Sequence, residues 1–286
     1  MLSDQLKSQI RAIHNRIKSS LPNYQARAGQ NQLVAEIAKI VAGTYHRHER
    51  IGLIEAGTGT GKSLAYMLAA IPYALSQKKK VVIATATVAL QEQLVNKDLP
   101  FFQQHSKLLF EFCLVKGRQR YACMERLRQQ QKHPELFAAV NDDVVDWHKL
   151  ADNWQQRFWL GDRDTLPAPL SDNMWQRIVA DPLHCHKHDR RHLNCPFYLA
   201  RAEIEHADVL VVNHALLLAD LASGNSVLPS PDDTLYIIDE AHHLPDIARD
   251  YFAAQAQLTH NSAWLEKAGK LVQQLIAVLP ATVMKE

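Results

Sequence analysis

Hydrophobic and polar positions alternate along the chain with two different periods. Near the start, apolar residues recur at helical spacing with charged residues between them, which predicts an amphipathic helix over residues 2–17. Helical patterns also follow the first two of a series of short apolar runs, at 61–76 and 88–96. Strands that alternate with helices predict an α/β fold with a parallel sheet covered on both faces. The runs that predict buried strands are 51–55, 81–85, 112–115, 209–213 and 235–239.

A long stretch in the middle of the chain interrupts this alternation. Residues 121–160 have a helical pattern with Trp147, Trp154 and Trp159 among charged residues, and 161–172 have the composition of a loop. The helical pattern resumes after Pro245. We therefore predict an α/β domain in two parts, 1–118 and 201–246, an inserted and mostly helical subdomain over 119–200, and the start of a helical insertion over 247–286.

Composition narrows the class of protein. With 47% hydrophobic and 22% charged residues among 286, the chain can bury an ordinary globular core. Its formal net charge of +2 means that any affinity for nucleic acid comes from local patches. The N-terminal pattern lacks the continuous apolar core of a signal peptide, and no run has the roughly 18 apolar residues needed to span a bilayer. We expect a cytoplasmic protein that does not enter membranes.

A glycine-rich segment, EAGTGTGKSLAY, lies between a predicted strand and a predicted helix, where a phosphate-binding loop belongs. Glycines let backbone N–H groups converge on phosphate oxygens, and the N-terminus of the helix adds positive charge. Lys62 would reach the β- and γ-phosphates of ATP, and the Ser63 hydroxyl would bind Mg²⁺. A glycine-rich turn with an incidental lysine is the alternative. The predicted nucleotide-binding residues are Ala56, Gly57, Thr58, Gly59, Thr60, Gly61, Lys62 and Ser63.

The strand predicted over 235–239 ends in an acidic pair, Asp239-Glu240, followed by Ala241 and His242. An aspartate at the tip of a buried strand can hold Mg²⁺, and the adjacent glutamate can deprotonate the attacking water. A solvated acidic strand end is the alternative. Together with the phosphate loop, the pair predicts ATP hydrolysis, with Lys62, Asp239, Glu240 and His242 as catalytic residues.

These two segments resemble motifs I and II of superfamily 2 helicases, and TATVALQEQL at 85–94 resembles motif Ia. LVKGRQRYAC at 114–123, CPFYLAR at 195–201 and DVLVVNHALLLADL at 208–221 resemble the DinG and YoaA branch of the XPD-like helicases. This resemblance implies a RecA-like ATPase domain, 5′-to-3′ translocation on single-stranded or forked DNA, and an iron–sulfur domain inserted between motifs Ia and II. It also suggests that Gln30, with Arg27 near it, lies at the adenine end of ATP; a surface glutamine is the alternative.

The resemblance further implies a [4Fe–4S] cluster held by four cysteines, but only three of those positions are cysteines here: Cys123, Cys185 and Cys195. The missing position falls near Arg190. We expect the fourth cysteine of the chain, Cys113, to be a buried core residue. Three interpretations of the insert remain open: His188 or His192 completes the cluster, the same Cys and His residues hold Zn²⁺, or the metal has been lost.

DNA contacts are predicted at motif Ia and along the basic stretch that leads into the insert. Cations there would follow phosphates while neighbouring aromatic faces stack on bases. A solvated basic patch is the alternative. The residues are Thr85, Thr87, Gln91, Lys116, Arg118 and Arg120, with Lys187, Arg190, Arg191 and Arg201 around the second half of the insert.

Two classes of function follow from these patterns. The first is an enzyme, the N-terminal ATP-binding part of a DNA helicase. The second is a binding module that grips nucleotide, single-stranded DNA or a replication or repair protein without unwinding. No segment matches helicase motifs III to VI, so we expect these residues alone to bind nucleotide with little turnover.

Overall fold

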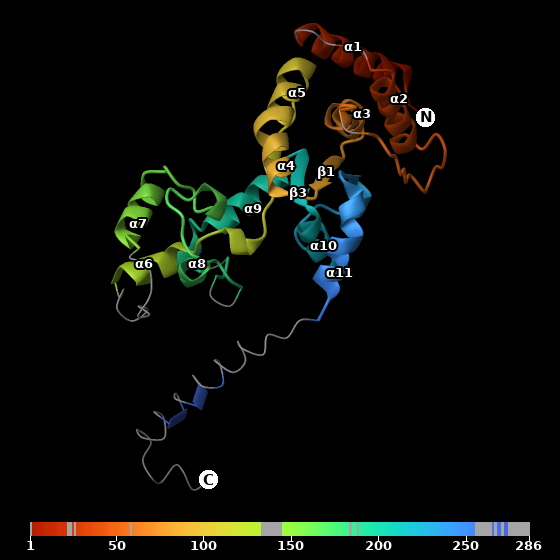
Figure 1. The fold of residues 1–286 in the computed structure, drawn as a ribbon. Helices are drawn as coiled ribbons and strands as arrows, with labels where there is room; N and C mark the ends of the chain where they lie inside the picture. Colours follow the sequence, from red (N-terminus) through yellow and green to blue (C-terminus); the bar gives the residue numbers. More distant parts are fainter. Residues whose placement is uncertain are drawn as a thin grey trace. The chain divides into compact units, whose positions relative to one another are not determined.

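The computed structural model describes residues 2–21, 25, 27–57, 59–132, 145–182, 185–187 and 189–254, and Leu265, Ala268, Gly269, Val272 and Gln273 (Figure 1). Contacts group the chain into two units, Met1–Ile247 and Ala248–Glu286. The domain boundaries drawn from the sequence stay predictions. No helix among the described residues is long and apolar enough to cross a bilayer.

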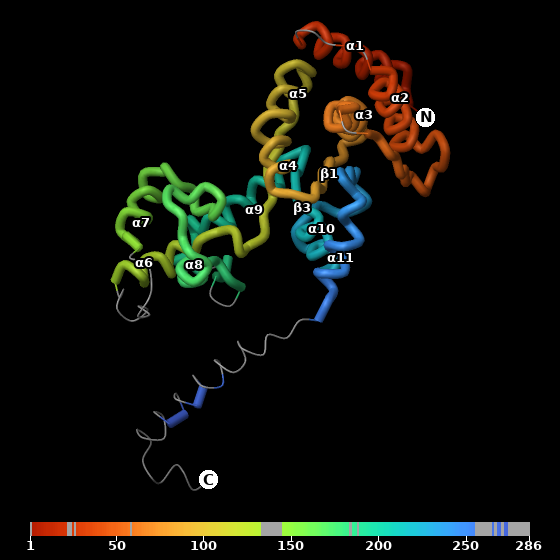
Figure 2. Tube along the Cα trace, in the orientation of Figure 1, coloured from red at the N-terminus to blue at the C-terminus, as the bar shows by residue number. Residues whose placement is uncertain are grey.

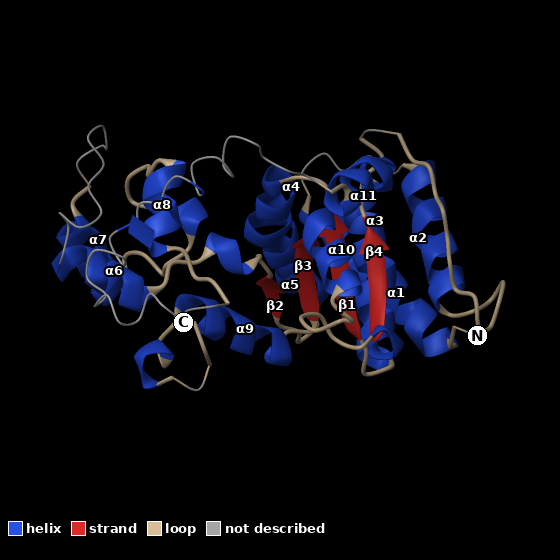
Figure 3. Ribbon diagram, turned by 90° about the horizontal axis from the view of Figure 1, so that it is seen from below, coloured by secondary structure: helices blue, strands red, loops and turns tan. Residues whose placement is uncertain are grey.

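Four parallel strands form the sheet at the centre of the first unit. Their order is β2-β3-β1-β4, and they lie side by side in Figure 3. The register places Val81 of β1 beside Val209 of β3 and Leu235 of β4. The predicted parallel α/β sheet is therefore confirmed. The strands are β1 (Lys80–Thr85), β2 (Phe112–Leu114), β3 (Val209–Asn213) and β4 (Thr234–Ile238).

Helices cover both faces of the sheet, because successive strand side chains point to opposite faces. Val81 and Ile83 of β1 join a core with α1 (Asp4–Ser20), α2 (Ala28–Val41), α3 (Lys62–Ser76) and α5 (Leu99–Ser106). Val82 and Ala84, which alternate with them, pack with residues of α9 (Pro196–His206) and α10 (His214–Ala222). This two-sided burial explains the uninterrupted apolar sequence of β1 and β3.

The amphipathic N-terminal helix is also confirmed as α1. The Ser3 side chain caps it by accepting a hydrogen bond from the Leu6 amide at 3.2 Å. Leu6, Ile10, Ile13 and Ile17 are buried on one face. The spacing of these residues thus predicted both the helix and the face that it buries.

One predicted strand does not form: residues 51–55 lie outside the sheet. Ile51 and Leu53 are 89% and 95% exposed. A β-prone sequence becomes a strand only when a neighbouring strand accepts its backbone hydrogen bonds. Among the described residues, no strand pairs with this segment or with the outer edge of β4. The prediction of a strand over 51–55 is wrong in this structure. An apolar pattern indicates a tendency to be buried and does not show whether a neighbouring strand is present.

The helix predicted over 88–96 continues further than its pattern suggested. It begins as α4 (Val88–Gln93), passes through a π-helical turn, η1 (Leu94–Asp98), and runs on as α5. Pro100 lies just after this π-helical turn; it has no N–H, so it cannot donate the hydrogen bond that would continue the helix at this position. The helical path nevertheless runs without a break from Val88 to Ser106, and a short segment then leads to β2 (Figure 2).

The insert has a hydrophobic core of its own, built around tryptophans. Trp159 and Trp175 are fully buried, and their indole N–H groups donate to the carbonyls of Asp162 at 2.7 Å and Gln119 at 2.9 Å. The helical pattern over 121–160 corresponds to α6 and α7, with 133–144 outside the described residues. The helices of this region are α6 (Met124–Lys132), α7 (Trp147–Gln155), α8 (Asp172–Ile178) and the short 3₁₀ turns η2 (Arg118–Arg120), η4 (Arg163–Thr165) and η5 (Arg190–His192).

The chain after β3 forms α10, returns to the sheet as β4 and continues past the acidic pair into two further helical segments. Two short 3₁₀ turns, η6 (Pro231–Asp233) and η7 (Ala241–His243), lie on either side of β4. The final helix, α11 (Leu244–Phe252), follows η7 directly. The helical pattern predicted after Pro245 is thus confirmed as far as Phe252.

Candidate functional site

The glycine-rich loop ends at Gly61, which is the N-cap of α3 and has φ of +81°. A side chain at this position would be strained and would overlap the amide nitrogen of Gln30. Gly59 also has a left-handed φ, of +79°. Thr60 tightens the turn, since its hydroxyl donates to the Gly57 carbonyl at 2.7 Å. Thr58, predicted to bind nucleotide, lies outside the described residues, and Ala56 packs against the core.

Two polar side chains brace this loop from α2 and the residue before it. Gln30 is 4% exposed and donates through Nε2 to the Gly61 carbonyl at 3.1 Å. Arg27 donates to the Gly59 carbonyl. The surface alternative for Gln30 is therefore wrong, because its amide is buried against the loop. Its contact with adenine stays a prediction.

The N-terminus of α3 follows the loop directly. The first amides of a helix, here those of Lys62 and Ser63, have no partner within the helix and carry partial positive charge. A left-handed glycine followed by such amides is a favourable setting for phosphate oxygens. The backbone geometry therefore suits an anion at this point.

The acidic pair reaches the same place from the end of β4. The Asp239 amide donates to the Ala84 carbonyl at 2.8 Å, which extends the pairing of β4 with β1 by one residue. Glu240 then places its Oε1 at 2.8 Å from Lys62 Nζ, across 178 residues of sequence. The phosphate loop and the acidic pair are thus brought together, as a shared site requires.

This contact sets the charge state of both groups. Its hydrogen bond raises the pKa of Lys62 and lowers the pKa of Glu240 from their ordinary values. Burial, followed by the charge of Glu240, raises the pKa of Asp239. Glu240 is therefore ionised near neutral pH. It is paired with the Lys62 ammonium group, and a phosphate group can compete for that cation.

Asp239 is held by two hydrogen bonds of different origin. Its Oδ1 accepts from the Glu240 amide at 3.1 Å, and its Oδ2 accepts from the Tyr66 hydroxyl at 3.3 Å. Ser63 lies three residues before Tyr66 on α3, about one turn away. Tyr66 therefore links Asp239 to the start of the helix that carries Ser63.

The backbone of Glu240 is left-handed, with φ of +53° and ψ of +44°. A residue with a branched or long side chain rarely adopts this left-handed conformation, and strain of this kind is found at functional positions. The turn directs the carboxylate to Lys62 on one side, while Oε2 lies 3.4 Å from Nδ1 of His242. The His242 ring is exposed and lies against His243, with ring centroids 4.0 Å apart.

Two residues of this site, Tyr66 and His214, were not predicted from the sequence. Tyr66 lies one helical turn after Lys62 on α3, so helical spacing could have found it. His214 is fully buried directly after β3, and its Nε2 is 3.0 Å from the Asp239 carbonyl. Parallel strands end at one edge of a sheet, which is the signal that could have placed His214 near Asp239.

The cysteines of the insert gather in a second, separate cluster. Cys123, Cys185 and His192 are buried and offer ligand atoms that all lie within 4.8 Å of one another. The Cys123 sulfur is 3.9 Å from His192 Nδ1. Cys195 is buried in the same apolar cluster. His188, the other predicted substitute ligand, lies outside the described residues.

Cys113 is placed apart from these residues, in β2, where it packs with apolar side chains of the sheet. Burial raises the pKa of its thiol to about 12. The prediction that Cys113 is a core residue is confirmed.

The predicted DNA-binding residues of motif Ia differ in their accessibility. Thr85 and Gln91 are buried, with 0% and 3% exposure. Thr87 is exposed, and its hydroxyl caps α4 by accepting from the Leu90 amide at 3.3 Å. Of these three side chains, only Thr87 offers surface to a ligand.

The basic residues that lead into the insert are engaged with neighbours. Lys116 bonds the carboxylates of Asp162 and Asp164, and Arg120 bonds Asp164. The Lys116 side chain is 11% exposed and that of Arg120 is 39% exposed. These carboxylates neutralise part of the positive charge that the sequence suggests.

Arg118 packs into the cysteine cluster. Its guanidinium lies 4.2 Å from the centre of the Phe197 ring, and it donates to the Cys185 carbonyl at 3.2 Å. Arg201, which is also close to the Phe197 ring at 5.0 Å, is partly buried. The sequence correctly predicted that basic and aromatic side chains lie together. In the structure, however, the guanidinium groups of the arginines lie against the Phe197 ring.

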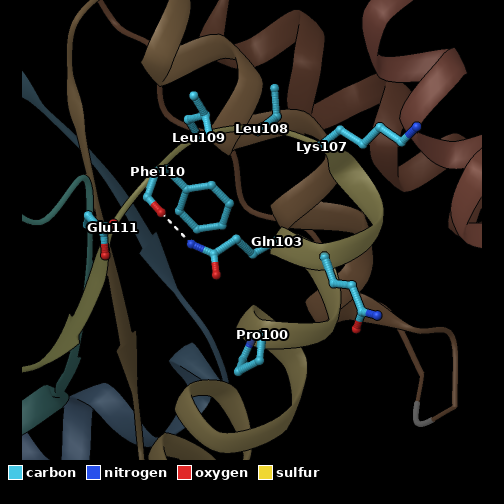
Figure 4. Close-up of a pocket in the computed structure, with 8 residues that line it drawn as sticks. Pro100, Gln103, Lys107, Leu108, Leu109, Phe110 and Glu111 are labelled. Atoms are coloured by element: carbon cyan, nitrogen blue, oxygen red, sulfur yellow. Dashed lines mark hydrogen bonds between the residues drawn. The ribbon is translucent and has the colours of Figure 1, made fainter.

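A hollow of about 500 Å³ lies away from both clusters, between α5 and the segment before β2 (Figure 4). The Gln103 amide crosses its floor and donates to the Phe110 carbonyl at 2.6 Å. None of the predicted site residues lines it. The lining residues are Pro100, Gln103, Gln104, Lys107, Leu108, Leu109, Phe110 and Glu111.

Comparison with known proteins agrees with this geometry. The chain is 44% identical over 290 residues to "ATP-dependent DNA helicase DinG" of Photobacterium profundum, covering 96% of this chain and 41% of that protein. The protein of the same name from Escherichia coli is 35% identical over 298 residues, covering 100% of this chain and 40% of that protein. The chain thus spans about two fifths of the length of these relatives.

Among solved structures, one titled "XPD_Helicase" is similar over 78% of this chain and 34% of that chain, with 16% identity and a TM-score of 0.42, too low to establish a common fold. The sequence profile of the DEAD_2 family matches residues 83–261, which include motif Ia, the insert and the acidic pair. This chain belongs to the DEAD_2 family.

Proposed function

We propose that this chain binds Mg²⁺–ATP between the phosphate loop and the acidic pair, and that it hydrolyses ATP as the N-terminal part of a 5′-to-3′ DNA helicase. The observation that carries the proposal is the 2.8 Å contact of Lys62 with Glu240. It unites two segments that are far apart in the sequence at one edge of the sheet, where ligands of open α/β sheets bind. Relatives named ATP-dependent DNA helicase support the choice of reaction.

The phosphate loop would bind the triphosphate through its backbone. The amides of Gly61, Lys62 and Ser63 would donate to phosphate oxygens, and Lys62 would exchange Glu240 for the β- and γ-phosphates. Gln30 and Arg27 support this role indirectly, since they hold the carbonyls of the loop away from the phosphate side. Gln30 would also contact adenine in this proposal.

The acidic pair would carry out the chemistry. Ser63 and Asp239 would hold Mg²⁺, which, when bound, neutralises charge on the phosphates. Tyr66 would keep Asp239 in position through its hydroxyl. Glu240, once released by Lys62, would accept a proton from the attacking water, with His242 beside its other oxygen.

DNA would pass over the exposed Thr87 and the basic surface of the insert. Arg120, Lys187 and Arg190 retain exposure there, whereas Lys116 is largely enclosed by carboxylates. Thr85, Gln91 and Arg118 would act by supporting the surface. Because the proposed helicase activity acts on DNA, we propose the cytoplasm as the compartment of this protein.

A binding module without hydrolysis is a second candidate. It is favoured by the segment 51–55, which leads into the phosphate loop without the support of a strand. A phosphate loop that is supported by the helix after it and by no strand before it can bind a phosphate group without orienting that group for attack by water. Such a module would grip single-stranded DNA or a replication or repair protein.

Substitutions at the site separate the two candidates. Lys62→Ala should weaken ATP binding about tenfold to a hundredfold, because a charge-assisted hydrogen bond is lost. Glu240→Gln should bind ATP within about twofold of the parent chain and hydrolyse it at least about a hundredfold more slowly, because the general base is gone. Fluorescent-nucleotide titration and phosphate release measure these effects.

Lys7→Ala is the matched control, since Lys7 lies on α1 and pairs there with Asp4. It should change neither quantity. An unaltered rate in Glu240→Gln would contradict the enzyme proposal. Tight ATP binding by the parent chain with no hydrolysis, with or without DNA, would establish the binding module instead.

The Lys62–Glu240 contact also predicts a pH dependence. Because Lys62 lowers the pKa of Glu240, Lys62→Ala should raise it, as followed by ¹³C NMR of the side-chain carboxyl. The stability contributed by a lowered carboxyl pKa is present above its unfolded pKa and is lost as the pH falls through the folded pKa. In the parent chain, this contribution should therefore be lost at a pH below the one at which Glu240 titrates in the Lys62→Ala variant.

Lys39→Ala provides the control for this titration. Lys39 pairs with Glu36 at 2.8 Å on α2, so its removal should raise the pKa of Glu36 and leave Glu240 unchanged. If Glu240 titrates at the same pH with and without Lys62, the contact does not set the charge of the site.

Salt dependence tests the DNA surface. Arg120→Ala and Arg190→Ala should each weaken binding to single-stranded DNA and reduce the slope of log K against log salt by about 0.7, as expected for one lost phosphate contact. Arg128→Ala removes an exposed arginine of the same insert that pairs with Glu125, and it should leave the slope unchanged. Equal slopes in all three variants would place the DNA elsewhere.

A further inference from the structure

The buried cluster of Cys123, Cys185 and His192 lies outside the proposed ATP site and has no part in hydrolysis. Its three ligand atoms come from separate segments of the insert: the residue before α6, the loop after α8, and η5. They all lie within 4.8 Å of one another and are shielded from solvent. Cysteine and histidine side chains that point at one another in this way form the donor set of a metal site.

The donor set does not fit the four-thiolate cluster that the resemblance implies. A [4Fe–4S] cluster binds four ligands, one on each iron, and the resemblance implies thiolates at all four positions. Only three cysteines lie in the insert, and the place of the fourth is near Arg190, which is exposed. Cys113 cannot substitute, because it is part of β2 and packs in the core of the sheet. Each thiolate of such a cluster also binds a different iron, which separates the sulfurs more widely than ligands that share one ion.

The spacing fits a single tetrahedral ion instead. Ligands at about 2.3 Å for sulfur and 2.0 Å for nitrogen, set at tetrahedral angles, lie about 3.5 to 3.8 Å apart. The Cys123 sulfur and His192 Nδ1 are 3.9 Å apart. We propose that Cys123, Cys185 and His192, whose ligand atoms form the close group, bind one structural Zn²⁺, and that the sulfur of Cys195, which lies outside that group, turns to the ion as its fourth ligand.

Cys195 completes the set as the fourth ligand. It is 2% exposed, belongs to the same apolar cluster as Cys123 and Cys185, and its amide donates to the His192 carbonyl at 3.0 Å. A closed set of three thiolates and one imidazole is a common structural zinc site.

Two of the sulfurs lie at the starts of helices. Cys123 directly precedes α6, and Cys195 is the N-cap of α9. The unpaired amides at a helix N-terminus favour negative charge, which suits the thiolate form that zinc requires.

Such an ion would tie the first helix of the insert to the last. Cys123 and Cys195 stand at the starts of α6 and α9, and the loop with Cys185 lies between them in sequence. The ion would take the place of a larger apolar core around this junction, as structural zinc does in small domains. Its role is therefore to hold shape, with no change of oxidation state.

Metal analysis of the complete chain tests this proposal. The chain is produced without a histidine tag in medium with both iron and zinc, and is purified without oxygen. We expect about one zinc per chain and almost no iron, with X-ray absorption distances of about 2.3 Å to sulfur and 2.0 Å to nitrogen in a ratio of three to one. Cobalt substitution should give the visible bands of a tetrahedral thiolate site.

Variants at His192 assign the nitrogen ligand. His192→Ala should retain zinc at least about tenfold more weakly against a chelator and lose the nitrogen contribution. His186→Ala removes an exposed histidine of the same loop and should change nothing. Because His192→Ala could unfold, His192→Cys provides a second test: it should keep one zinc with sulfur ligands alone.

Three results would overturn the proposal. The first is a brown protein with about four irons per chain. The second is a chain that binds neither metal when zinc is supplied during folding. The third is a zinc signal whose nitrogen contribution survives in both His192 variants. None of these outcomes bears on ATP binding by Lys62 and Asp239, so failure here is distinct from failure of the proposed function.

Discussion

The ion pair between Lys62 and Glu240 is the interaction on which the proposed site depends. Lys62 begins the helix after the phosphate loop, and Glu240 follows the last strand of the sheet. Parallel pairing of β4 with β1 and packing of α3 on the sheet are both needed for the two side chains to meet. Without nucleotide, the glutamate neutralises a cation that would otherwise lie exposed among backbone N–H groups. The same contact therefore stabilises the free state and marks the place of the phosphates.

The features predicted from the sequence are those that local patterns encode. Strands β1 and β3 are buried on both faces, so their continuous apolar runs gave their positions almost to the residue. The turn at Gly59 and Gly61 requires left-handed backbone angles that favour glycine, so the glycines in the sequence indicated the turn. Lys62, Asp239 and Glu240 lie at helix and strand ends, where such motifs could be recognised without coordinates.

The features that escaped prediction depend on contacts between distant segments. Tyr66 and His214 look like ordinary core residues until β3 and β4 are placed on either side of β1, and Lys116 looks free until Asp162 and Asp164 fold against it. The segment 51–55 has strand-like composition but no described partner strand. The insert shows the same limit, because the choice among three interpretations of its cysteines depends on the distance of His192 from Cys123.

A crystal structure of the chain with Mg²⁺ and a non-hydrolysable ATP analogue tests the central claim most directly. We predict that Lys62 Nζ leaves Glu240 and bonds the β- and γ-phosphates, with Ser63 and Asp239 on either side of the magnesium and Glu240 free to face a water. Nucleotide bound elsewhere, with Lys62 still paired to Glu240, would contradict the account.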